Sequence, residues 1–188
     1  MNARRRILAA SLAAATLALL GPQVHAQAPK VLKISHQFPG GSIDEGDFRD
    51  RMLRKFAAEV EKRTNGQLKF EIYPGGSLVK PVEQWGAMAN GSLDLSLYPL
   101  AYAGGRVPEL NIGLMPALVT SYEQGLRWKD APIGKELTRI VEEKGVKIIT
   151  WVWQAGGVAS RSRPIVAPED AKGLTVRGGS REMDMVLR

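Results

Sequence analysis

The stretch LKFEIYPGG at residues 68–76 decides the fold, together with the segments on either side of it. Leu68, Phe70 and Ile72 alternate with more polar side chains, which is the period of a strand with one buried face. The Pro74-Gly-Gly sequence ends this run, because proline lacks a backbone N–H and glycine favours turns. The stretch therefore predicts a strand that is followed by a turn.

Helical patterns flank this strand on both sides. Before it, apolar side chains recur every four residues over residues 46–63, and Asp44 is placed to cap the helix start. After it, Pro81 opens a second helix that Asn90-Gly91 ends. These two patterns predict a helix before the strand and a helix after it.

Two further β-type runs lie outside these helices, at residues 31–35 and 93–98. The order is therefore strand, helix, strand, helix, strand. That order predicts an α/β fold with a largely parallel sheet covered by helices.

The second half of the chain is expected to continue as a mixture of helices and strands. We predict a short helix and packed loop at 110–119, helices at 121–129 and 133–144, strands at 146–153, 156–163 and 174–177, a turn from Pro168, and a helix from Ser180. That last helix reaches Arg188 with fewer than three turns and no terminator. Because such short helices are rarely stable alone, we expect the sequence to be part of a longer chain.

Residues 1–26 have the pattern of an export signal. Three arginines at 4–6 precede an apolar, alanine-rich run at 7–20, and Val24-His25-Ala26 places small residues at the cleavage position. The run is shorter than the ~20 residues that span a bilayer. We expect cleavage after this segment and a periplasmic mature chain, and both the general secretory and the twin-arginine route remain open.

Composition excludes several classes of protein. Removing residues 1–26 lowers the formal charge from +7 to +4, and the remaining charges mix in sign, as at 59–63. A basic arm for nucleic acid is therefore not expected. The chain has no cysteine, which excludes disulfides and thiol nucleophiles. Its 44% hydrophobic residues suffice for a buried core.

Common enzyme motifs are missing from the sequence. The chain has two histidines, and His25 is expected to leave with the export signal, so His36 alone cannot build a histidine-rich metal site. There is no Gly-x-Ser-x-Gly elbow and no phosphate-binding loop of the Gly-x-x-x-x-Gly-Lys type. We therefore predict a protein that is not an enzyme and that holds no metal and no cofactor.

Several short strings occur in a distinctive order. They are KFA at 55–57 with Glu61 and Thr64-x-Gly66, YPGGSL at 73–78, NGSLD at 90–94, LMPAL at 114–118, RPI at 163–165 and PEDAKGLTVR at 168–177. Together they resemble the DctP-type solute receptors of tripartite ATP-independent periplasmic (TRAP) transporters. The resemblance runs from about Val31 to the end of the chain.

The resemblance implies an α/β receptor of the periplasmic-binding-protein type, with two lobes that close on a ligand at a hinge cleft. By this analogy residues 29–153 form the first lobe, and residues 154–188 begin a second lobe that is truncated in this chain. The implied function is the capture of a small organic carboxylate and its delivery to TRAP permease subunits in the inner membrane. We expect the full-length protein to be a monomer.

The resemblance places the family's ligand-anchoring arginine on Arg177. A guanidinium group binds a planar carboxylate through two parallel charge-assisted hydrogen bonds, which lysine cannot copy. The other expected cleft residues stand near strand ends that face the same region. They are Gln37 and Phe38 after the first strand, Tyr98 at the end of the third, and Trp153 and Gln154 at the expected crossing between lobes.

The sequence departs from the sialic-acid-binding members of that family. Gly157 stands where those members carry a second arginine, and Lys80 and Pro99 stand where they carry acids, so sialic acid is disfavoured. Two alternatives stay open: a periplasmic ligand sensor for a signalling receptor, and a hydrolase or isomerase on an α/β scaffold. Receptor and sensor both bind and close, so the sequence does not separate them.

Overall fold

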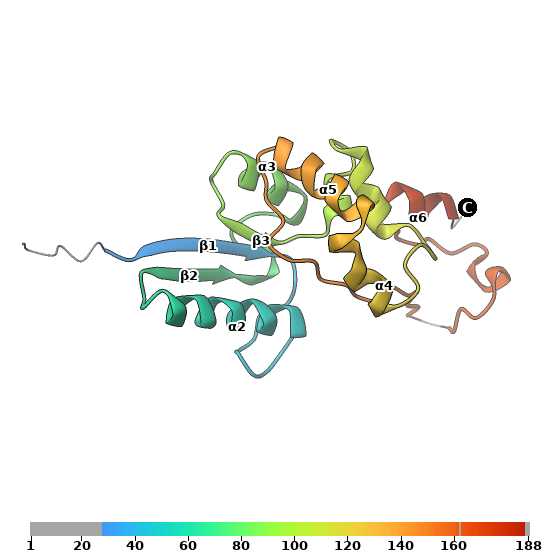
Figure 1. The fold of residues 1–188 in the computed structure, drawn as a ribbon. Helices are drawn as coiled ribbons and strands as arrows, with labels where there is room; N and C mark the ends of the chain where they lie inside the picture. The colour runs from blue at the N-terminus through green and yellow to red at the C-terminus, as the bar shows by residue number, and fades with distance from the viewer. Residues whose placement is uncertain (1–27, 162, 187–188) are drawn as a thin grey trace, which may run out of the picture.

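The computed structural model describes residues 28–161 and 163–186 (Figure 1). A three-stranded parallel sheet in the order β2-β1-β3 forms its centre. The strands are β1 (Lys30–His36), β2 (Leu68–Tyr73) and β3 (Leu95–Leu97). In the register, the fully buried Ile34 of β1 pairs with Ile72 and Leu95. The parallel sheet predicted from the element order is confirmed.

Helix α2 (Phe48–Arg63) joins β1 to β2 and runs along the sheet on one side, with α3 on the other (Figure 1). Its Phe56 meets Phe70 of β2 edge to face, with 5.8 Å between ring centroids. The predicted capping residue is wrong. The helix is capped by Asp47, whose carboxylate accepts the backbone N–H of Arg49 at 2.9 Å, because Asp44 lies one turn earlier in a loop held by Ser42.

The second predicted helix is confirmed between β2 and β3. It begins as a 3₁₀ turn, η2 (Pro81–Glu83), and continues as α3 (Gln84–Ala89). Its buried Gln84 side chain donates to the Val79 carbonyl at 3.0 Å and accepts from the Ser96 hydroxyl at 2.8 Å, which ties the helix to β3.

Helical segments make up most of the chain from residue 100 to residue 143. They are η3 (Leu100–Ala103), η4 (Pro108–Leu114), α4 (Tyr122–Arg127), η5 (Trp128–Asp130) and α5 (Pro132–Glu143). The three helical regions predicted there are confirmed. Together with α3 and the residue before η4, these segments form a hydrophobic core of Trp85, Ala103, Val107, Leu110, Trp128, Leu137 and Val141.

The three strands predicted after residue 145 are wrong for the described residues. Residues 146–153, the described part of 156–163, and 174–177 run as irregular chain. A strand needs a hydrogen-bonded neighbour, and the apolar side chains of the first segment instead pack on the helices. Trp151 and Trp153 both lie against Trp128, with ring centroids 6.4 and 5.1 Å away.

The end of the described chain agrees better with the sequence. A short 3₁₀ turn, η6, covers Pro168–Ala171, and α6 covers Arg181–Val186. The backbone N–H of Met183 donates to the Ser180 hydroxyl at 3.2 Å, as a capping serine does. The predicted export signal at 1–26 lies outside the described residues.

Candidate functional site

Three of the predicted ligand-binding residues, Gln37, Phe38 and Tyr98, lie where the parallel strands end. Phe38 follows β1 by two residues, and Tyr98 follows β3 directly. Because both strands point the same way, their carboxyl ends meet at one edge of the sheet, which is where open α/β sheets bind ligands. Gln37 is half-buried at this edge, and its side chain makes no hydrogen bond to the described residues.

Arg177 reaches this edge from a segment far along the chain. Its Nη2 donates to the Tyr102 hydroxyl at 2.9 Å, and the guanidinium carbon lies 6.0 Å from the centroid of the Tyr102 ring. Tyr102 in turn meets Tyr98 edge to face at 6.1 Å. The structure thus brings Arg177 and Tyr98 together through Tyr102, although the strand that was expected to carry Arg177 is absent.

Tyr98 presents a buried hydroxyl to this cluster. The oxygen has no hydrogen-bond partner among the described residues. Burial raises the pKa of Tyr98 to about 12, with Arg106 opposing the rise and Tyr102 adding to it. The hydroxyl therefore keeps its proton at neutral pH. An unpartnered buried hydroxyl costs about 1–3 kcal/mol, which a ligand oxygen accepting its hydrogen bond would recover.

A second cluster forms around Arg49 in the first turn of α2. Nε and Nη2 of Arg49 donate to the Asp47 carboxylate at 2.8 and 2.6 Å, and this hydrogen bonding lowers the pKa of Asp47 to about 2. The guanidinium lies 3.8 Å from the centroid of the Phe38 ring. Its Nη1 donates to the Gln154 amide oxygen at 3.1 Å. Arg49 thus joins two predicted ligand-binding residues that are far apart in the sequence.

Trp153 is mainly a packing residue. Its ring stacks on Trp151 with centroids 6.3 Å apart and lies against Gly125 of α4, where an added Cβ would come within 2.7 Å of the ring. Its indole Nε1 is nevertheless buried without a hydrogen-bond partner among the described residues. The Trp153 side chain therefore packs in the core and leaves its indole N–H without an acceptor.

Sequence reasoning missed Asp47, Arg49 and Tyr102. Tyr98 directly follows β3 and Tyr102 lies in η3, with the extended Pro99 between them, so their contact depends on the folded turn and no helical spacing indicated it. Arg49 two residues after Asp47 likewise carried no signal, because its contacts with Phe38 and Gln154 depend on the folded loop.

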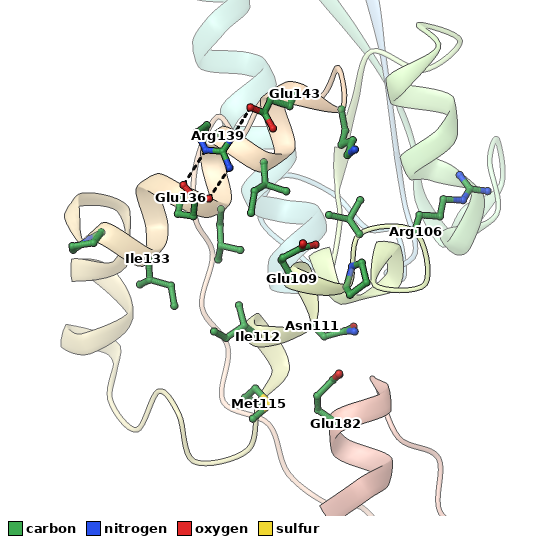
Figure 2. A pocket seen from close by; sticks show the side chains of 16 residues that line it. Arg106, Glu109, Asn111, Ile112, Met115, Ile133, Glu136, Arg139, Glu143 and Glu182 are labelled. Carbon is green, nitrogen blue, oxygen red and sulfur yellow. Dashed lines mark hydrogen bonds and ion pairs between the residues drawn. The ribbon is translucent and has the colours of Figure 1, made fainter.

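A groove of about 990 Å³ lies elsewhere, between η4 and α5, and Glu182 of α6 is among the residues that line it (Figure 2). None of the six predicted ligand-binding residues lines it. Arg139 on its rim is paired with Glu136 and Glu143, so this guanidinium is already neutralised. Arg106 and Lys144 also line the groove, so cations are present there, but none of the predicted ligand-binding residues does. We therefore place the candidate site at the sheet edge, where Phe38, Tyr98 and Arg177 lie.

Two other kinds of site are not found in the part of the chain that the structure describes. Within residues 28–161 and 163–186, no three His, Asp or Glu side chains gather closely enough to hold a metal ion. No helix in those same ranges has the length and apolar character to cross a bilayer.

Comparison with protein families identifies the chain. Residues 42–187 match the model of the DctP family, described as bacterial extracellular solute-binding protein, family 7. The chain belongs to the DctP family. The resemblance found in the sequence is thereby confirmed, and this family consists of solute-binding receptors.

Solved DctP relatives share the fold. A TRAP periplasmic solute-binding protein from Rhodoferax ferrireducens with bound malonate is 68% identical, with a TM-score of 0.80, over 83% of this chain and 49% of that one. One from Polaromonas sp. JS666 bound to D-erythronate is 28% identical, with a TM-score of 0.69, over 84% of this chain and 50% of that one. These relatives have two lobes, so the predicted fold class is confirmed.

A characterised DctP relative extends the comparison. The C4-dicarboxylate-binding periplasmic protein DctP of Rhodobacter capsulatus is 29% identical over 175 residues, which are 92% of this chain and 51% of that protein. The chain thus spans about half the length of the relatives it matches.

Proposed function

We propose that this chain forms the carboxylate-binding part of a periplasmic receptor, which captures a small organic acid without altering it and delivers it to TRAP permease subunits in the inner membrane. The observation that carries this proposal is the state of Arg177. Its guanidinium is exposed, is oriented by the Tyr102 hydroxyl, and forms no ion pair with the described residues.

The chemistry of the Arg177 cluster suits a carboxylate. A guanidinium with free N–H groups binds both oxygens of a carboxylate in one plane, and a hydrogen bond to a charged group contributes about 1.5–3 kcal/mol. Aromatic rings of Tyr98 and Tyr102 provide apolar contact for the body of the ligand.

The relatives support the same class of ligand. The Rhodoferax protein binds malonate, the Polaromonas protein binds D-erythronate, and the Rhodobacter protein is named for C4-dicarboxylates. All three ligands are small organic carboxylates. We extend this class, but none of these individual acids, to the present chain.

We also propose that the first lobe ends near Trp153 and that Gln154 begins the segment leading into the second. Supporting this division, every buried hydrophobic residue of the described chain lies at or before Val141. The Arg49–Gln154 hydrogen bond would then connect the first lobe to the start of the second, at the mouth of the cleft. The pattern at residues 1–26 supports a periplasmic location, and we propose a monomer for the full-length receptor.

A thermal-shift screen of organic acids on the purified protein, followed by titration calorimetry, tests the proposed function. A bound acid raises the melting temperature, because binding to the folded state alone stabilises it by mass action. We expect small carboxylates to do so and the corresponding amides to do nothing. A screen in which no carboxylate raises the melting temperature would contradict the proposal, and so would turnover of a bound acid.

A further inference from the structure

A buried network of charged and polar side chains lies beneath the candidate site. His36 at the end of β1 and Asp50 in the first turn of α2 both have side chains that are 0% exposed. His36 Nε2 lies 3.0 Å from Asp50 Oδ1, and Arg54 Nε donates to Asp50 Oδ2 at 2.7 Å. None of these three side chains belongs to the carboxylate cluster described above.

This network holds the loop between β1 and α2 at two points. The backbone N–H of Phe38 donates to His36 Nδ1 at 3.2 Å, and the backbone N–H of Gly41 donates to Asp50 Oδ2 at 2.9 Å. Because Nδ1 accepts a hydrogen bond, it carries no proton, so the single imidazole proton is on Nε2 and is donated to Asp50. The geometry therefore requires a neutral imidazole.

Two side chains pack against the Phe38 ring. The His36 ring stacks with it at 5.9 Å and an angle of 28° between planes, and the Arg49 guanidinium lies 3.8 Å from its centroid. Gln37 lies between His36 and Phe38 in the same loop. The position of two predicted ligand-binding residues thus depends on His36.

Burial also favours the neutral imidazole. Burial lowers the pKa of His36 below its ordinary value of 6.5, and Arg54 acts in the same direction, while Asp50 and Asp47 oppose them. Burial raises the pKa of Asp50, but hydrogen bonds from Arg54, Gly41 and His36 outweigh it and leave that pKa lowered. Asp50 is therefore an anion when His36 takes up a proton.

We propose that His36 is a positioning residue for ligand capture, whose neutral form fixes the loop carrying Gln37 and Phe38 and whose protonation at Nδ1 releases that loop. This inference rests on the proposed function. A proton on Nδ1 turns the acceptor into a donor that faces the Phe38 N–H, so their hydrogen bond is lost. Acidification below the pKa of His36 then weakens carboxylate binding.

Two substitutions separate the two hydrogen bonds of His36. His36→Asn keeps an oxygen near the position of Nδ1, so it can still accept the Phe38 N–H, but it does not titrate. His36→Gln extends toward Asp50 and leaves the Phe38 N–H without an acceptor. Ile34→Val, buried in the same strand, is the matched control for a general loss of stability.

Calorimetric titration with malonate from pH 8 to pH 5 measures how acidification changes the affinity. Wild type and variants are compared at each pH, so the protonation of malonate itself affects all of them equally and cancels. If only the neutral imidazole supports binding, wild-type affinity falls about tenfold per pH unit below the pKa of His36, because the competent fraction falls by that factor. We expect His36→Asn to lack this extra dependence, His36→Gln to bind weakly at every pH, and Ile34→Val to follow wild type. A His36→Asn variant with the wild-type pH dependence overturns the proposal.

Nuclear magnetic resonance of the imidazole provides an independent measurement, with the His36 signal assigned by its absence from His36→Asn. Linkage is reciprocal, so saturation with malonate should raise the acid dissociation constant of His36 by the same factor by which protonation weakens malonate binding, and the pKa of His36 should fall by the logarithm of that factor. An unchanged pKa with malonate bound overturns the positioning role and leaves the proposed function intact. If malonate does not bind, the proposed function still stands or falls by the screen of organic acids. The positioning role is then decided by the Phe38 amide signal: a signal that moves with the His36 titration supports it, and one that does not respond overturns it.

Discussion

Replacing Arg177 by lysine is the sharpest test of the carboxylate site. Lysine keeps the positive charge but loses the planar pair of donors, and it cannot donate to the Tyr102 hydroxyl and a ligand in one plane. The change removes about one hydrogen bond to a charged group, which corresponds to about 1.5–3 kcal/mol. Affinity for the acid that the thermal-shift screen identifies should therefore fall about ten- to more than a hundredfold.

Titration calorimetry on the folded variant measures this loss. Arg63→Lys is the matched control, because Arg63 forms an exposed pair with Glu59 within α2 and should leave affinity unchanged. Tyr102→Phe removes the hydroxyl that orients Arg177 and should cost about 0.5–1.5 kcal/mol, with the two effects not additive because the residues are in contact. Unchanged affinity in a folded Arg177→Lys variant would remove Arg177 from the site.

Three further predictions concern the residues around this site. Arg49→Gln should weaken carboxylate binding in the wild-type background and weaken it less when Gln154 is already alanine, because Arg49 contacts both Phe38 and that amide. Calorimetry of both backgrounds measures this difference, and equal effects would separate Arg49 from Gln154. Gly125→Ala should lower the free energy of unfolding, measured by urea denaturation, by about 1–3 kcal/mol, because the added Cβ would lie 2.7 Å from the Trp153 ring. A stabilised variant would show that the ring moves aside. The lowered pKa of His36 means that the unfolded chain takes up a proton before the folded chain does as the pH falls. The free energy of unfolding should therefore be at its full value above pH 6.5 and should fall below that pH by at most about 1.4 kcal/mol per pH unit. This slope should be smaller in His36→Asn, and an equal slope would contradict the neutral imidazole.

The sheet and its flanking helices could be predicted from the sequence, because the spacing of apolar side chains in each of these segments fits either a strand or a helix but not both. Phe70 and Ile72 alternate as strand residues do, and the four-residue repeat of α2 places Phe56 toward the sheet. The strand predicted at 146–153 failed because Trp151 and Trp153 have the same alternation, yet in the structure both rings pack on Trp128. Period-two spacing reports an extended chain and not a hydrogen-bonded neighbour.

Only some residues of the candidate site could be predicted from the sequence, and the side chains that connect them could not. The family resemblance indicated Arg177, and strand ends indicated Phe38 and Tyr98. The side chains that connect them, Tyr102 and Arg49, depend on contacts between residues 75 and 105 positions apart. The choice of Asp47 over Asp44 as the helix cap likewise depends on where the loop turns.

The Asp47–Arg49 pair also bears on how an acid approaches this edge. Asp47 cancels the charge of Arg49 where it stands, whereas the charge of Arg177 has no such counterpart among the described residues. Of these two guanidinium groups, only that of Arg177 therefore keeps an uncompensated positive charge. A molecule with one charged end and one uncharged end would be attracted toward Arg177 by its charged end before any contact is made, so that it arrives with its carboxylate leading.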